Sequence, residues 1–179
     1  FKTEQWFETF KYNSKTTNGT AKDLEADFAL PSILSLGVGY QFNERTLIAV
    51  DARRFDYGNA DLFGDSPEND GLGWRSIWAF AVGAHYRVND FVSAQAGYLY
   101  NQNPIPQGST FFNIQLPAIN TNSVSGGVTV ALTESVDLVG SAVYAFTQTN
   151  RSSILEIPGT EIQLKQDLGT FSLGLRFRL

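Results

Sequence analysis

The chain alternates, in one segment after another, between bulky apolar side chains and small or polar ones. Between positions 83 and 100, for example, Ala84, Tyr86 and Val88 are interleaved with a glycine, a histidine and an arginine. Successive side chains of a β-strand point to opposite faces, so a period of two predicts strands with one apolar face. Helical periodicity is almost absent. The fold must therefore cover the apolar face of a sheet, and the question is what covers it.

The alternation predicts eight strands. We expect them at residues 2–12, 23–42, 45–57, 75–88, 91–100, 112–132, 135–148 and 160–179. The second would be a single strand about 66 Å long at ~3.3 Å per residue. Pro31 lies inside it, and proline offers no N–H to a strand ladder, so we expect a bulge or a missing hydrogen bond there.

The connections between these strands are of two kinds. Three are short and polar, namely Asn43-Glu44, Asn89-Asp90 and Thr133-Glu134. Three are long and polar, and they cover residues 58–74, 101–121 and 149–167. Short turns at one end and long loops at the other are typical of bacterial outer-membrane β-barrels, in which the long loops face the outside of the cell.

The composition of the two strand faces distinguishes a membrane barrel from a soluble β-sandwich. A sandwich would place Lys, Glu, Thr and Asp on its water-facing side. Here that side is mostly Gly, Ser, Ala and Gln, which suits a crowded or water-filled barrel interior. Aromatic residues gather near the strand ends of the other side, as in interfacial girdles. We therefore predict an antiparallel transmembrane outer-membrane β-barrel, with Tyr86 and Tyr98 facing lipid.

Composition also excludes several functions. The formal net charge is −5, so no basic surface for nucleic acid is expected. There is no cysteine and a single histidine, which argues against a thiol nucleophile and against a catalytic metal site. No apolar stretch is long enough for a membrane-spanning helix. We expect no catalytic residue, no metal and no cofactor.

The order of landmarks along residues 24–179 resembles the C-terminal half of a known family. These landmarks are Leu30-Pro31, Ser35-Leu36-Gly37-Val38-Gly39-Tyr40, Asn103-Pro104-Ile105-Pro106 and Ile114-Gln115-Leu116-Pro117. The family is FadL/TodX, the outer-membrane transporters of long-chain fatty acids and other hydrophobic compounds. The resemblance implies a 14-stranded barrel with an N-terminal plug, an extracellular groove, a pocket inside the barrel and a lateral opening for ligand release.

This chain departs from that pattern because it has room for only about eight strands. We expect residues 1–179 to be one barrel domain that forms the C-terminal portion of a larger barrel, without the plug and the early strands. The last strand alternates like the terminal strands of outer-membrane proteins but ends in Leu179 rather than phenylalanine, and we expect this leucine to be the natural C-terminus. The alternative is a complete eight-stranded barrel in which residues 2–12 pair with 168–179.

Two groups of residues are candidates for ligand contact. Five fall on the predicted interior face and could bind a ligand's polar group: Asp51, Arg53, His85, Arg87 and Gln95. In the simpler interpretation, interior arginine and aspartate pair with one another and fill the barrel, and His85 only lines it. Four apolar residues of the second long loop could form an extracellular groove or be the outer end of a strand: Phe111, Phe112, Ile114 and Leu116.

Passive transport of a hydrophobic small molecule, such as a long-chain fatty acid, is the function that these observations favour. A structural barrel that serves as a subunit or anchor of a larger surface assembly is the alternative, because a fold alone does not determine a function. An outer-membrane enzyme ranks last, since no GxSxG motif or cluster of carboxylates accompanies the histidine. The expected partners are outer-membrane lipid and lipopolysaccharide, the hydrophobic ligand and, in the alternative, other chains of a membrane complex.

Overall fold

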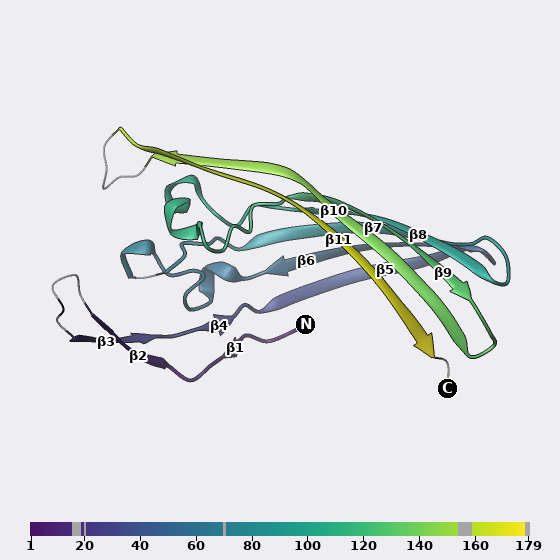
Figure 1. The fold of residues 1–179 in the computed structure, drawn as a ribbon, viewed down its shortest axis with the longest axis horizontal. Coiled ribbons are helices and arrows are strands. Elements are labelled where there is room, and N and C mark those ends of the chain that lie inside the picture. Colours follow the sequence, from purple (N-terminus) through teal and green to yellow (C-terminus); the bar gives the residue numbers. More distant parts are fainter. Residues whose placement is uncertain (16–18, 20, 70, 154–158, 178–179) are drawn as a thin grey trace.

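A seven-stranded antiparallel sheet dominates the fold, and each strand pairs with its neighbours in sequence (Figure 1). The computed structural model describes residues 1–15, 19, 21–69, 71–153 and 159–177. The strands of the sheet are β5 (Ile33–Asn43), β6 (Thr46–Phe55), β7 (Ile77–Arg87), β8 (Val92–Asn101), β9 (Asn122–Ala131), β10 (Val136–Ser153) and β11 (Glu161–Phe177). No helix in the described part of the chain is long and apolar enough to span a membrane.

Four short strands precede the sheet. The first, β1 (Gln5–Trp6), pairs with β4 (Ala29–Leu30), and β2 (Phe10–Lys15) pairs with β3 (Ala21–Ala26). Lys2 forms a bridge to Ile33 at the start of β5. Among the described residues β11 pairs only with β10. The pairing of residues 2–12 with 168–179 is therefore wrong, and so is a complete eight-stranded barrel closed in that way.

The predicted long strands at the N-terminal end are interrupted. The segment predicted as one strand from 23 to 42 forms β3, β4 and β5. One break falls at Pro31 and Ser32, where a ladder donor was expected to be missing, and the Ser32 carbonyl there accepts a hydrogen bond from the Asp56 N–H at 3.0 Å. The other falls at Asp27, whose carboxylate accepts the Thr9 hydroxyl at 2.7 Å. The predicted strand 2–12 is likewise divided, into β1 and the beginning of β2.

Two other predicted boundaries are wrong for physical reasons. Residues 112–121 form a 3-10 turn, η4 (Phe111–Asn113), and a loop, because Pro117 cannot donate to a ladder and the chain bonds locally instead. Only β9 remains of the predicted strand 112–132. Residues 149–153, predicted as part of a loop, extend β10, whereas β11 begins at Glu161, in agreement with the predicted strand 160–179. Residues 149–153 are all polar and so lack the alternation that marks a strand facing lipid.

The three short turns form as predicted, and asparagine side chains shape two of them. The Asn43 carboxamide oxygen accepts the N–H groups of Arg45 and Thr46, both at 2.9 Å. That of Asn89 accepts the N–H groups of Phe91 and Val92 at 2.9 and 2.8 Å. Asparagine favours turns because its side chain can replace a backbone acceptor in this way. We call this edge of the sheet the turn end and the opposite edge the loop end.

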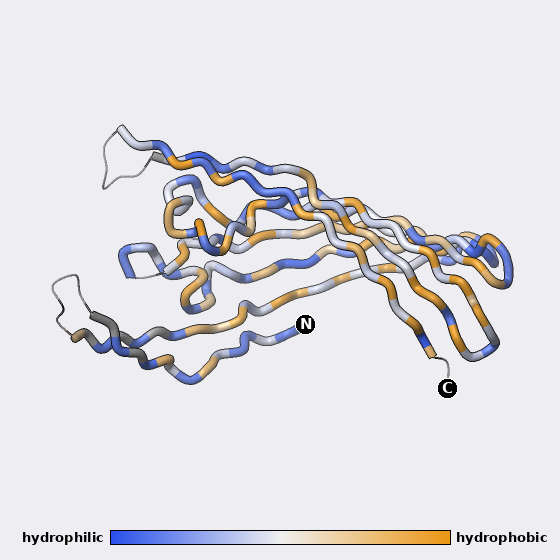
Figure 2. Tube along the Cα trace, in the orientation of Figure 1, coloured by the Kyte–Doolittle hydropathy of each residue, from blue (hydrophilic) through white to orange (hydrophobic). Residues whose placement is uncertain are grey.

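The cross-strand register gives the sheet two chemically different faces. One row of directly opposite residues is Val38, Val50, Val82, Tyr98, Val124 and Tyr144. The adjacent row belongs to the other side, where glycine, alanine and serine dominate, and Figure 2 shows the resulting alternation along each strand. Leu36, Phe80 and Leu175 are 78%, 48% and 57% exposed, so the apolar face is not covered by protein. These two sides are called the apolar face and the polar face.

The polar face is the concave one. The two long connections β6–β7 and β8–β9 pack together around a core of Ala60, Phe63, Trp74, Ile105 and Ile119. This loop core continues the polar face, because Phe55, on the same side of β6 as Asp51, stacks on Tyr57 at 5.8 Å. It contacts Phe28 beside β4 and Leu164 of β11, at the two ends of the sheet. One compact cluster can reach both ends only if the sheet curves around it.

One irregularity interrupts the β10–β11 pairing. The register shifts between Ala145 and Gln148, which face Leu168 and Gln166. Strand β10 therefore carries one residue more than β11 at this point, which is a β-bulge. Beyond it, Asn150 is buried and donates a hydrogen bond to the Thr110 hydroxyl at 3.1 Å, so it lies on the concave side.

The two faces predict different costs for the same substitution on one strand. Val50→Arg places a charge on the apolar face at mid-strand and is expected to reduce the free energy of unfolding in lipid vesicles by about 2–4 kcal/mol. Ala49→Arg, one residue earlier, points to the polar face beside small side chains and should cost clearly less. Urea titration of both variants measures the difference. Equal losses would contradict this assignment of the faces.

Candidate functional site

A pocket of about 320 Å³ lies where the loop core meets the polar face near the loop end. Its apolar walls come from the two long connections and the start of β7. They are formed by Tyr57, Trp74, Ile77, Pro104, Leu116 and Pro117. A concave, mostly apolar cavity with few polar groups is typical of small-molecule sites.

The aromatic wall of the pocket is held by close ring contacts. The ring centre of Trp74 lies 5.0 Å from that of Tyr57 and 5.0 Å from that of Phe63. Burial raises the pKa of the Tyr57 hydroxyl, which therefore stays protonated at neutral pH. Trp74 is nearly buried, and its indole N–H donates to the Asn113 side chain.

Asn113 fastens the two long connections together. Its side chain is fully buried, with 0% exposure. Besides accepting from Trp74, it donates to the carbonyls of Leu72 at 2.8 Å and Ser109 at 2.7 Å. A buried carboxamide with three hydrogen bonds is well satisfied, so it fixes the roof of the pocket rather than binding a ligand.

Three amide side chains form the polar edge of the pocket. Asn101 donates to the Asn120 carbonyl at 2.8 Å, and Asn120 donates to the carbonyls of Phe146 and Gln166 at 3.0 and 3.2 Å. The Gln166 side-chain oxygen is buried and has no hydrogen-bond partner among the described residues. A buried acceptor without a partner is costly, so this oxygen is available to a hydroxyl or amine donor in the pocket.

A carboxylate supports the loop beside the pocket. Asp56 accepts the Ser76 hydroxyl at 2.7 Å and the Asn59 side-chain N–H at 2.9 Å. These two hydrogen bonds, first that of Asn59, lower the pKa of Asp56, and the nearby Arg54 contributes. The carboxylate thus joins η1 (Tyr57–Asn59) to the residue just before β7.

The residues predicted to line the barrel interior all lie on the polar face, where they border three separate hollows. Arg53 pairs with Asp51, with its Nε 3.2 Å from Oδ1, and both line a hollow of about 430 Å³. His85 and Gln95 face each other across β7 and β8 and line a hollow of about 330 Å³. Arg87, with His85, borders a third hollow at the turn end. Their role in ligand binding stays a prediction.

One ion pair on the polar face follows the simpler interpretation of interior charges. Arg176 of β11 donates from Nε and Nη2 to Asp137 Oδ2 of β10, at 2.9 and 2.6 Å. Asp137 is 1% exposed. The pair lines the hollow at the turn end that Arg87 and His85 also border. Arg178, the other arginine of this strand, lies outside the described residues.

The four residues predicted as an extracellular groove lie in the loop and not on a strand. Phe111 and Phe112 are exposed and contact each other with ring centres 5.4 Å apart. Leu116 lines the pocket described above, whereas Ile114, equally exposed, does not. The alternative that these residues form the outer end of a strand is wrong. Their role in a groove stays a prediction.

Sequence reasoning missed most of the pocket. Its overlooked members are Tyr57, Trp74, Ile77, Asn101, Asn120 and Gln166. A tryptophan inside a long polar loop was the available signal, because such a residue usually needs a buried site and a partner for its N–H. The described residues contain no group of three or more His, Cys, Asp or Glu that could hold a metal ion.

The profile of the family described as "Outer membrane protein transport protein (OMPP1/FadL/TodX)" matches residues 2–176, nearly the whole chain. The chain belongs to this family. No significantly similar sequence was found among curated proteins. As a member of the OMPP1/FadL/TodX family, the protein resides in the outer membrane.

Solved structures show the same fold. The Pseudomonas putida toluene transporter TodX is 17% identical, with a TM-score of 0.54 over 93% of this chain and 40% of TodX. A Pseudomonas aeruginosa FadL homologue is 19% identical, with a TM-score of 0.52 over 87% of this chain and 36% of the homologue. OmpT of Vibrio cholerae is 21% identical, with a TM-score of 0.55 over 97% and 48%. The chain thus spans less than half the length of these outer-membrane barrels and corresponds to part of one.

The hydrogen bonds of Asn113 predict that its loss loosens the loops. Asn113→Ala leaves the Trp74 N–H and two carbonyls buried without partners, at a cost of about 1–3 kcal/mol for an unsatisfied group. Hydrogen exchange at residues 72–74 should accelerate while the strands stay protected. Asn69→Ala, at an exposed position of the connection that contains residues 72–74, is the control. It should change neither the stability nor the exchange rates. Unchanged exchange in Asn113→Ala would refute the fastening role.

The lowered pKa of Asp56 predicts a pH-dependent contribution to stability. A carboxyl whose pKa is lower in the folded state stabilises the fold above its unfolded pKa of about 3.9, and this contribution is lost as the pH falls through the folded value. Wild type should therefore be more stable than Asp56→Asn at pH 7, and the difference should shrink toward pH 3. Urea unfolding in vesicles at several pH values measures it. A difference independent of pH would contradict the prediction.

Proposed function

We propose that this chain forms part of the wall of a passive channel for small hydrophobic compounds, and that the pocket beneath the loops is their binding site. The observation that carries the proposal is the pocket itself, with aromatic and aliphatic walls and three amides at one edge. Its place under the long loops, which face the outside in barrels of this kind, suits capture from the external medium. No covalent chemistry is required.

The pocket favours a compact, flat ligand. A cavity of about 150 Å³ accommodates benzene, so about 320 Å³ leaves room for a substituted single ring. Such a ring can contact Tyr57 and Trp74 by stacking or edge-to-face packing. A ligand hydroxyl can donate to the Gln166 side-chain oxygen. TodX, a relative of similar fold, is a toluene transporter, which agrees with a monoaromatic ligand class.

Long-chain fatty acids form the second ligand class. An acyl chain longer than the pocket would continue along the hollows of the polar face, toward the predicted interior residues. Arg53 is already paired with Asp51, so its guanidinium is less available to a ligand carboxylate. Arg87 lies at the turn end, farther from the loops than Arg53, and is the better candidate for a charge-assisted hydrogen bond to that carboxylate.

Substitutions at two nearby loop residues, Leu116 and Ile114, distinguish ligand binding in the pocket from ligand binding in a surface groove. Leu116→Asp puts a charge at the pocket wall and should weaken toluene binding at least about tenfold, because burying an unpaired charge is costly. Ile114→Asp, two residues earlier and equally exposed (46% against 47%), should leave binding unchanged if the pocket is the site. A groove formed by all four residues predicts loss in both variants.

Tryptophan fluorescence of the detergent-purified protein measures binding of toluene and, separately, of palmitate. Toluene binding lost only in Leu116→Asp supports the pocket. Palmitate binding lost in Arg87→Gln, with toluene binding kept, supports the fatty acid class. Absence of binding by either compound, together with a stoichiometric partner chain, would refute transport and favour the structural role.

A further inference from the structure

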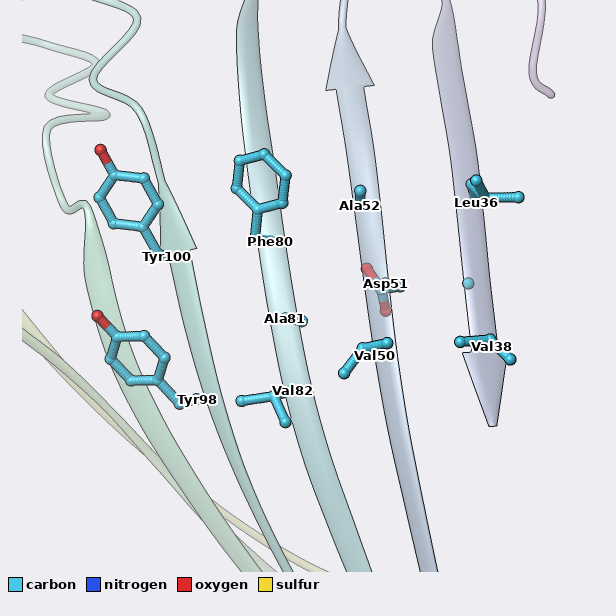
Figure 3. A pocket seen from close by; sticks show the side chains of 11 residues that line it. Leu36, Val38, Val50, Asp51, Ala52, Phe80, Ala81, Val82, Tyr98 and Tyr100 are labelled. Carbon is cyan, nitrogen blue, oxygen red and sulfur yellow. The ribbon is translucent and has the colours of Figure 1, made fainter. Parts of the chain in front are cut away.

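The apolar face carries a groove of about 560 Å³ over β5–β8, shown in Figure 3. It exists because one cross-strand row runs Leu36, Ala52, Phe80, Tyr100, and the single methyl group of Ala52 lies between large neighbours. In Figure 3 the side chains of Tyr98 and Tyr100 stand along one margin and Leu36 along the other. The groove faces away from the polar interior and is separate from the pocket beneath the loops.

A cationic side chain, Arg54, lies on the same face beside this groove, toward the loop end. The next row of the apolar face is Leu34, Arg54, Trp78. The Arg54 guanidinium carbon is 5.9 Å from the centre of the Trp78 ring, a cation–π contact that orients it. It is therefore an arginine on the membrane-facing side of the barrel, at the point where the apolar rows end.

The guanidinium keeps most of its donors available. Its nearest carboxylate oxygen among the described residues is Asp56 Oδ1, at 3.8 Å, which is too long for a hydrogen bond. Asp56 already accepts hydrogen bonds from Ser76 and Asn59. The Arg54 side chain is 43% exposed, so a group arriving from the membrane can reach it.

The depth of Arg54 matches the outer boundary of the bilayer. The long loops face outward, and aromatic residues such as Trp78 lie at the headgroup level. Arg54 to Val50, where the groove ends on β6, is about 13 Å of strand at ~3.3 Å per residue. A ligand that places a phosphate on Arg54 would therefore extend an acyl chain down the groove.

We propose that Arg54, Trp78 and the groove around Ala52 bind one phosphorylated glycolipid of the outer leaflet, the lipid A part of lipopolysaccharide. A sugar phosphate accepts paired hydrogen bonds from the guanidinium, a geometry that arginine favours. One acyl chain occupies the groove between Leu36, Phe80 and Tyr98. Charge and shape thus select the same molecule, because the cation and the acyl-chain groove are continuous on one surface.

Native mass spectrometry of the detergent-purified protein, titrated with lipid A, tests the site. Arg54→Gln should weaken retention of one lipid A about tenfold, as expected for loss of one charge-assisted hydrogen bond. Ala52→Phe should fill the groove and weaken it similarly, although this outward side chain meets no protein core. Arg151→Gln, an exposed arginine on β10, and Ala94→Phe, on the same face of β8 nearer the turn end, are the matched controls. Heat-modifiable migration on gels confirms that each variant is folded.

The comparison of lipids identifies the source of binding. Lipid A stripped of its phosphates should bind wild type and Arg54→Gln equally weakly if the proposal is correct. Equal binding of intact lipid A by wild type and both test variants would overturn it. So would preferential retention of phosphatidylethanolamine, or a dimer that Ala52→Phe abolishes, since the groove would then belong to another lipid or to a second copy of the chain.

Discussion

Every backbone N–H and C=O of a chain that crosses a bilayer must find a partner within the protein, because hydrocarbon offers none. In this chain seven consecutive strands, each hydrogen-bonded to its neighbour in sequence, meet the requirement everywhere except along the outer edges of β5 and β11, which are the two ends of the described sheet. The pairing fixes the register, and the register decides which side chains face lipid and which face the interior. The valine and tyrosine row through Val50 and the small row through Ala49 are consequences of that one constraint.

The loops complete what the sheet begins. The concave side of the sheet is lined by glycine, alanine and serine, which alone would leave an open trough. Two long connections fold back over its loop end, fastened to each other by Asn113 and to the ends of the sheet by Phe28 and Leu164. A pocket with aromatic walls results, although the described residues of the two connections form no helix of more than one turn. Curvature of the sheet and closure of the roof are thus parts of one arrangement.

The sequence pattern predicted the strands that face lipid well, and it predicted the parts of the chain beyond the lipid poorly. Strands β6, β7 and β8 fall within a few residues of their predicted bounds because lipid on one side forces an alternation that is plain to read. The outer part of β10, with Thr149 and Arg151, was mistaken for a loop because polar side chains on both sides remove that alternation. The pocket could not be predicted because its members, from Tyr57 to Gln166, come together only through tertiary packing.

The bulge in β10 has a consequence for how such a wall can change length. An insertion of one residue in a regular strand exchanges its two faces beyond that point, which would turn charged groups toward the acyl chains. Strands of this kind can therefore grow or shrink in evolution only by pairs of residues. The extra residue between Ala145 and Gln148 resets the parity, so that Asn150 is directed inward again. An odd insertion is tolerable at such a place, and the outer hairpin is free to diverge in length from the part embedded in the membrane.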